Sequence, residues 1–70
     1  MSESIHITVN GEPQAVEAGT SVEALLERMG LPRERLAVER NRRVVRKVDW
    51  AATELADGDR LEIVHFVGGG

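Results

Sequence analysis

The sequence predicts an α+β domain of two layers, in which one helix covers one face of a small twisted sheet. Strand-like apolar segments lie near both ends of the chain, at about residues 5–9 and 60–66. Between them, residues 21–29 carry an apolar stripe with helical spacing. One helix of this length can cover only one face of a sheet, so the sequence favours two layers over three.

The first strand and its hairpin are predicted by alternation. Its apolar positions are Ile5, Ile7 and Val9. Asn10-Gly11 follows as a turn, because both residues tolerate positive φ. Residues 12–17 should then return as the second strand of the hairpin. Pro13 has no backbone N–H, which favours an edge position for this strand.

The helix has signals at both ends. Thr20 and Glu23 fit a capping box, in which the Thr20 oxygen accepts a hydrogen bond from the backbone amide three residues on and Glu23 reaches back. Gly30 can supply a left-handed cap, and Pro32 prevents continuation. The apolar stripe consists of Val22, Leu25, Leu26 and Met29. We therefore place a core-facing helix at about residues 21–29.

The middle of the chain predicts two more strands. Residues 36–40 form the longer one, with Leu36 and Val38 facing the core. Residues 41–43 are the expected turn into a short strand at about 44–45. A turn of helix or 3₁₀ helix is expected at 49–53, where Trp50 packs on the core or, alternatively, stacks on a ligand.

The last strand is expected at about residues 60–66, after a turn at 57–59. The first and last strands are the best candidates for central positions in the sheet. Val64 and Phe66 fall on the face opposite Leu61 and Ile63. With one helix available, that face has no obvious cover. Val64 and Phe66 are therefore either a docking surface for a partner or the cover of a small second core.

The chain ends in Gly68, Gly69 and Gly70, directly after an apolar segment. A run of glycines can be threaded where any Cβ would clash, which suits insertion into another protein's active site. Glycine runs also occur as disordered ends or linkers. We expect one domain at residues 1–67 and a flexible reactive tail at 68–70.

Composition narrows the class of protein. Seventy residues bury only about 60% of the unfolded chain's surface, which disfavours large ligand pockets and conventional enzymes. The absence of cysteine excludes disulfides, thiolate metal sites and a cysteine nucleophile. His6 and His65 lack a third ligand for a metal. No apolar run reaches the roughly 20 residues of a membrane span and no signal peptide is recognised, so we expect a cytoplasmic protein.

Charge is unevenly distributed along the chain. The net charge is −3, but seven of the nine Lys and Arg residues lie in a basic segment from Arg33 to Lys47. Nucleic-acid sites usually add interleaved aromatic residues or a recognised reading motif, and neither occurs in this segment. We expect a solvated loop or a surface that faces a protein partner, and no nucleic acid.

The order and spacing of these motifs resemble the ThiS family, the sulfur carriers of the thiamine pathway. The resemblance spans nearly the whole chain and rests on the segments 5–12, 20–26, 37–41, 57–59 and 63–70. It implies a ubiquitin-like β-grasp fold with a mixed sheet of four or five strands. Arg42 and Arg46 stand where relatives often carry Gly and Pro, which puts the local turn shape in question. A third glycine also follows the usual terminal pair.

The resemblance implies a carrier that is not itself an enzyme. Gly70 would carry the terminal carboxylate that an E1-like adenylyltransferase activates, with Gly68 and Gly69 as the flexible tail. ATP and magnesium would be used by that enzyme, and this chain would bind no cofactor. A persulfide donor such as a cysteine desulfurase would then convert the adenylate to a thiocarboxylate. The thiocarboxylate would give its sulfur to a thiazole synthase.

Three other functions remain open from the sequence. Other β-grasp sulfur carriers, such as the small subunit of molybdopterin synthase or carriers for tRNA thiolation or cysteine synthesis, share the terminal glycine. A ubiquitin-like modifier would instead form an isopeptide bond with lysine. A plain interaction module with an inert tail would do neither.

Overall fold

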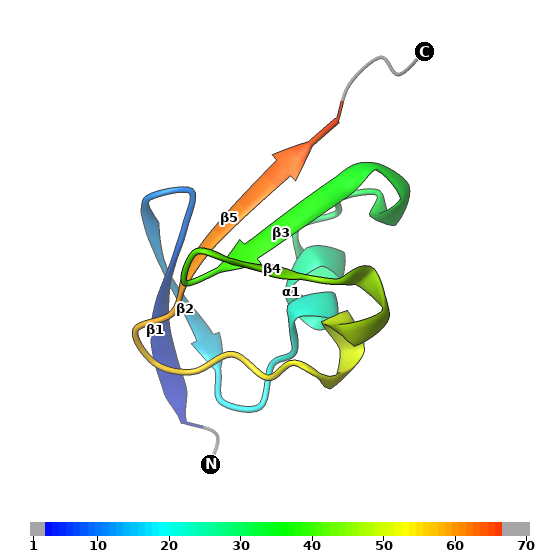
Figure 1. Ribbon diagram of the computed structural model, residues 1–70. Helices are drawn as coiled ribbons and strands as arrows, with labels where there is room; N and C mark the ends of the chain where they lie inside the picture. Colours follow the sequence, from blue (N-terminus) through cyan, green and yellow to red (C-terminus); the bar gives the residue numbers. More distant parts are fainter. Residues whose placement is uncertain (1–2, 67–70) are drawn as a thin grey trace.

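The computed structural model describes residues 3–66, which form a five-stranded sheet with one α-helix packed against it (Figure 1). In chain order the elements are β1 Ser4–Val9, β2 Glu12–Glu17, α1 Val22–Arg28, η1 Arg33–Arg35, β3 Leu36–Arg40, β4 Arg43–Val45, η2 Lys47–Ala52 and β5 Arg60–His65, where η denotes a 3₁₀ helix. The two-layer α+β fold expected from the sequence is confirmed.

The sheet is mixed, with strand order β2-β1-β5-β3-β4. β1 and β5 run parallel, and the other neighbouring pairs are antiparallel. β5 is the central strand and β1 is paired on both sides, as expected for the first and last strands. β2 lies at an edge, where Pro13 pairs with Thr8, and this prediction is also confirmed.

One core lies between the sheet and α1, which is behind β3 and β4 in Figure 1. Its buried apolar residues are Ile7, Val9, Val16, Val22, Leu25, Leu26, Leu36, Val38, Trp50, Leu55 and Leu61. Trp50 is the largest of them, and its indole N–H donates to the Val45 carbonyl at 2.9 Å. A buried Trp with its one donor satisfied is a packing residue, so the prediction that Trp50 packs on the core is confirmed.

The helix begins one residue later than the capping box requires. Ser21 is the N-cap, and its Oγ accepts from the Ala24 backbone N–H at 3.0 Å. Thr20 instead donates through Oγ1 to the Glu17 carbonyl at 2.7 Å, and the Glu23 carboxylate lies 3.0 Å from Arg33 Nη1. The predicted Thr20 cap is therefore wrong. Thr20 and Ser21 both suit the N-cap position, but the Thr20 hydroxyl is already hydrogen-bonded to the preceding turn.

The C-terminal end of the helix shortens the predicted apolar stripe. α1 ends at Arg28, so Met29 is the C-cap and is 37% exposed, against the expectation that it lies in the core. Gly30 has φ of 72° and supplies the predicted left-handed residue. The short helix η1, Arg33–Arg35, was not predicted.

Two hairpins of the sheet use the same kind of turn. Asn10 and Gly11 have φ of 50° and 83°, and Asn41 and Arg42 have φ of 52° and 69°. Two-residue loops with both residues left-handed match the right-handed twist of the flanking strands. The arginine at position 42 has therefore not changed the turn shape that glycine would favour, although its Cβ makes this conformation unfavourable.

Arg42→Gly is expected to raise the free energy of unfolding by about 0.5–1 kcal/mol, because glycine reaches positive φ without the Cβ clash. Urea denaturation measures the change. Arg43→Gly is the matched control, since the neighbouring Arg43 lies in β4 and glycine weakens a strand. A lower stability for Arg42→Gly as well would contradict the assignment of backbone strain to Arg42.

Residues 3–66 contain no helix that is long and apolar enough to cross a lipid bilayer.

Candidate functional site

The residues expected to carry the chemistry follow β5. Gly68, Gly69 and Gly70 lie outside the described residues, and Phe66 is the last residue within them. The Phe66 N–H donates to the Arg35 carbonyl at 2.8 Å, so the backbone is still bound to the β3 side at this point. The C-terminal end of β5 lies at one extremity of the domain (Figure 1). The last described residue therefore lies at the outside of the domain.

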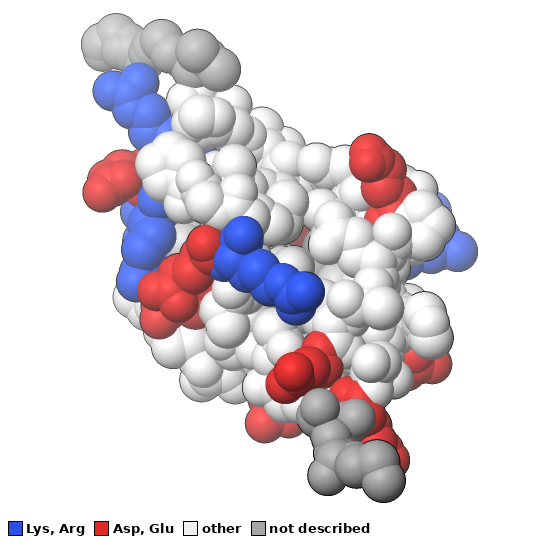
Figure 2. Space-filling view, turned by 180° about the vertical axis from the view of Figure 1, so that it is seen from behind, with Lys and Arg blue, Asp and Glu red and all other residues white. Residues whose placement is uncertain are grey.

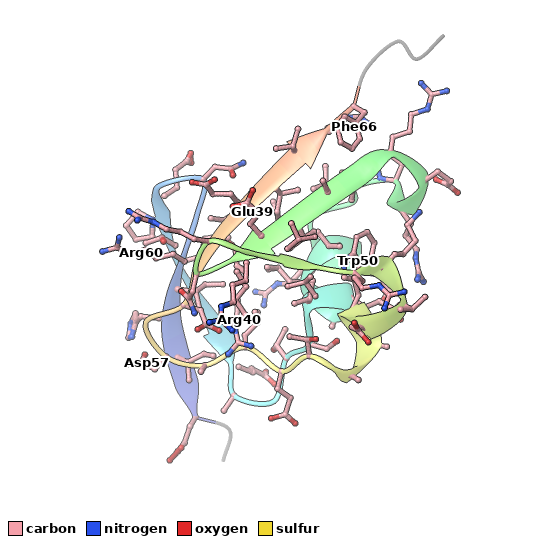
Figure 3. The ribbon with its side chains drawn as sticks, viewed as in Figure 1. Glu39, Arg40, Trp50, Asp57, Arg60 and Phe66 are labelled. Carbon is pink, nitrogen blue, oxygen red and sulfur yellow. The ribbon has the colours of Figure 1, made fainter. Side chains whose placement is uncertain are left out.

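The sheet face opposite α1 near the end of β5 is exposed and partly apolar. Leu61 points to the core and is 1% exposed, whereas Val64 and Phe66 are 52% and 56% exposed. Figure 3 shows Phe66 where β5 ends. These two side chains do not cover a second core. They form an apolar pair on what we call the outer face, the surface of β3, β4 and β5 that α1 does not cover.

Two carboxylates lie beside this apolar pair. Glu39 of β3 is directly opposite Glu62 of β5, and the next pair on the same face is Ala37 with Val64. Like charges placed opposite each other in a sheet are unfavourable. None of the three ion pairs found among residues 3–66 includes Glu39 or Glu62. Alternation along β5 predicts the apolar pair. The facing of the two carboxylates depends on the β3–β5 register, which the sequence does not specify.

Asp59 fixes the beginning of β5. It is 5% exposed, and its carboxylate accepts from Arg40 Nε at 2.8 Å, Asn41 Nδ2 at 3.0 Å and the Ala56 N–H at 2.7 Å. Figure 3 shows Arg40 reaching from β3 toward the loop that precedes β5. The sequence predicts only a turn at this position. Asp59 anchors that turn to the β3–β4 hairpin and thereby sets where β5 starts.

The pKa of Asp59 lies below its ordinary value. Burial by itself raises the pKa, because it disfavours the charged form. The hydrogen bonds from Ala56, Asn41 and Arg40, together with the positive charge of Arg40, outweigh this effect and stabilise the carboxylate. Asp59 is therefore a charged structural anchor and not a proton donor near neutral pH.

The basic segment is divided among several local contacts. Arg33 pairs with Glu23 and Arg40 with Asp59, while Arg33 and Lys47 lie 5.9 and 5.8 Å from the centre of the Trp50 ring. Such cation–π contacts are stabilising. The view from behind shows acidic and basic side chains interspersed on that side of the molecule (Figure 2). Several cations of the segment thus have structural roles.

The hollows found in the described part of the chain are open depressions. The larger, of about 630 Å³, lies against β4 and η2 and includes Arg43 and Asp49. Residues 3–66 also contain no group of three His, Asp or Glu side chains that could hold a metal ion. Within these residues the outer face beside the end of β5 is the strongest candidate for recognition.

Comparison with known proteins points to one family. A model of the ThiS family matches residues 7–70. The chain is 48% identical over 64 residues to a thiazole synthase of Magnetococcus marinus, a match that covers 91% of this chain and 20% of that protein. It is 43% identical over 54 residues to the sulfur carrier protein ThiS of Bacillus subtilis, covering 77% of this chain and 80% of that one.

A solved structure is similar over almost the whole chain. The crystal structure of the thiamine biosynthesis protein ThiS from Geobacter metallireducens has a TM-score of 0.77 and 35% identity, and the match covers 94% of this chain and 100% of that one. By contrast, the chain spans about a fifth of the length of the thiazole synthase that it matches. The similarity to ThiS therefore covers most or all of each chain, and the similarity to thiazole synthase covers only a segment of that protein.

Proposed function

Because this chain belongs to the ThiS family, the β-grasp sulfur carriers of thiamine biosynthesis, we propose that Gly70 supplies the carboxyl group on which the sulfur is carried. The observation that supports this most is the extent of the family match, which runs through residue 70 and thus includes all three glycines. The folded domain then serves as a handle that partner enzymes recognise.

A carboxylate must be activated before sulfur can replace its oxygen. An E1-like adenylyltransferase would bind ATP and magnesium and let the Gly70 carboxylate attack the α-phosphate. This attack releases pyrophosphate and leaves an acyl-adenylate. This chain has no Gly-rich phosphate-binding loop followed by Lys-Ser or Lys-Thr, so the nucleotide would be held by that partner. A persulfide, formed by a cysteine desulfurase, would displace AMP, and reductive cleavage of the resulting acyl disulfide by a thiol would leave the thiocarboxylate.

The acceptor of the sulfur would be a thiazole synthase. A relative with that name contains a segment that is 48% identical to this chain, which supports a functional link between the two kinds of domain. The C-terminal end of β5 at the outside of the domain supports the same proposal, because the carboxylate could then visit enclosed active sites while the domain stays outside (Figure 1).

Intact-mass measurement tests the proposal. Incubation with ATP, the activating enzyme and a persulfide source should add about 16 Da, the difference between sulfur and oxygen, to the C-terminal peptide. The mass of protein isolated from its own cell also reports whether Gly70 carries the free carboxylate there. Conjugates with other proteins would point to a ubiquitin-like modifier, and an unchanged mass would contradict sulfur carriage.

Phe66→Asp is expected to weaken binding to the activating enzyme or the synthase about tenfold or more. The change replaces an exposed apolar side chain at the end of the outer face by a carboxylate. Val48→Asp is the control, because Val48 is also an exposed apolar residue, at 75%, but lies on η2. Titration calorimetry measures both affinities. Equal affinities for the two variants and the parent chain would remove Phe66 from the docking surface.

A further inference from the structure

The pairing between β1 and β5 ends before β5 does. Two residue pairs join these parallel strands, Thr8 with Arg60 and Val9 with Leu61. The chain of β1 then turns away at Asn10, while β5 continues to His65. The C-terminal half of β5 would therefore have no neighbour on the β1 side unless another group replaced the missing strand.

The Asn10 side chain replaces it. Asn10 Oδ1 accepts from the Ile63 N–H at 2.8 Å, and Asn10 Nδ2 donates to the Ile63 carbonyl at 3.2 Å. The backbone N–H of Asn10 also donates to the Leu61 carbonyl at 2.8 Å. A side-chain amide has the same donor and acceptor as a peptide group, so Asn10 adds one more rung to the sheet where β1 has ended.

The β5 backbone alternates between its two neighbours. Even-numbered residues direct their backbone groups toward β3: the Arg60 carbonyl accepts from the Asn41 N–H, and the Phe66 N–H donates to the Arg35 carbonyl. The backbone polar groups of Leu61 and Ile63 point toward β1. Asn10 binds the Leu61 carbonyl through its backbone and both Ile63 groups through its side chain. Within the described residues, Asn10 is thus the last group that holds β5 from the β1 side, and its contact is at Ile63, three residues before Phe66 and seven before Gly70.

The second hairpin provides a natural comparison. Asn41 holds the same turn position as Asn10, with φ of 52° against 50°. Asn41 Oδ1 accepts from the Arg60 N–H at 2.9 Å, and Nδ2 donates to Asp59 Oδ1 at 3.0 Å. The two asparagine side chains therefore bind β5 from opposite sides, Asn41 at Arg60, its first residue, and Asn10 at Ile63, in its C-terminal half.

We propose that Asn10 is a positioning residue for the reaction of Gly70, since it holds the C-terminal end of β5 in the sheet and so fixes the direction in which the chain leaves the domain. This role rests on the proposed function. Without the amide, β5 beyond Leu61 is held only by β3, and residues 63–66 sample more directions. Productive entry of Gly70 into a partner then requires more ordering, which raises KM, while the bound carboxylate reacts as before.

The test uses Asn10→Gly, with Asn41→Gly as the matched control. Glycine keeps positive φ at both turns and removes only the side-chain amide. Pyrophosphate release by the activating enzyme is measured as a function of carrier concentration, at a temperature where all variants are folded. We expect KM to rise about fivefold for Asn10→Gly with kcat within about twofold, the scale of two ordinary hydrogen bonds. Asn41→Gly should leave KM unchanged.

Two further measurements separate positioning from general stability. Asn10→Asp keeps the acceptor for the Ile63 N–H but sets a second acceptor against the Ile63 carbonyl in place of the donor, so its KM should also rise above that of the parent chain. Amide exchange at Ile63 should accelerate in Asn10→Gly and not in Asn41→Gly. Equal KM values for parent and Asn10→Gly, or equal increases for both glycine variants, would overturn the positioning role alone. Failure of the parent chain to be adenylated would overturn the proposed function, and the positioning role with it.

Discussion

Replacing Gly70 by valine should slow adenylation by about 100-fold or more, because a branched side chain next to the reacting carboxylate displaces it from the attack geometry. The domain should fold as before, since its buried apolar residues lie between Ile7 and Leu61. Pyrophosphate release at saturating carrier concentration measures the chemical step, and thermal unfolding measures stability.

The series Gly70→Ala and Gly70→Val provides an internal control for this effect. If the position is limited by space, the rate should fall with side-chain size, and alanine should be intermediate. The affinity for the activating enzyme should change little, because recognition is assigned to the outer face. An adenylation rate for Gly70→Val equal to that of the parent chain would contradict insertion of this residue into a narrow site.

Asp59→Asn is expected to lower the free energy of unfolding by about 2–3 kcal/mol. The substitution keeps the volume but removes the charge that pairs with Arg40. It also turns one acceptor into a donor beside the donors from Arg40, Asn41 and Ala56. A domain of this size is stable by roughly 4–10 kcal/mol, so the loss is large. Urea denaturation at pH 7 measures it.

The same variant tests the pKa of Asp59. The folded state lowers this pKa, so the stabilisation from the ionised form is fully present above the ordinary Asp value of about 3.9. It is lost as the pH falls through the lower pKa of the folded state. The stability difference between parent and Asp59→Asn should therefore be constant above about pH 5 and shrink below about pH 4. A difference independent of pH down to pH 2 would contradict the lowered pKa.

Much of the fold can be predicted from the sequence because strands and helices leave different spacings of apolar residues. Three local patterns predicted elements that the structure contains. They are the alternation in 5–9, the turn at Asn10-Gly11 and the stripe from Val22 to Leu26. The prediction of Thr20 as the N-cap was wrong because two adjacent hydroxyl residues, Thr20 and Ser21, both suit the N-cap position. The prediction that Met29 lies in the core was wrong because the helix ends at Arg28, one residue before the last apolar position of the stripe.

The candidate site could be predicted only in part, because some of its contacts depend on how distant segments pair. Exposure of Val64 and Phe66 follows from alternation along one strand and a single helix. The facing of Glu39 and Glu62 requires the register between two strands. The bonds from Asn10 to Ile63 join residues 53 positions apart, so a turn asparagine that completes a sheet has no signature of its own in the sequence.

The central place of β5 also bears on how the protein is made. Among the strands of residues 3–66, β5 is the last to be synthesised, yet it joins the β1–β2 hairpin to the β3–β4 hairpin. A nascent chain that lacks it has two hairpins and no strand between them, so the core cannot close until residues 60–65 have left the ribosome. Folding is therefore completed by the strand that leads to the proposed reactive end, and a chain truncated before β5 would offer partner enzymes neither the outer face nor Gly70.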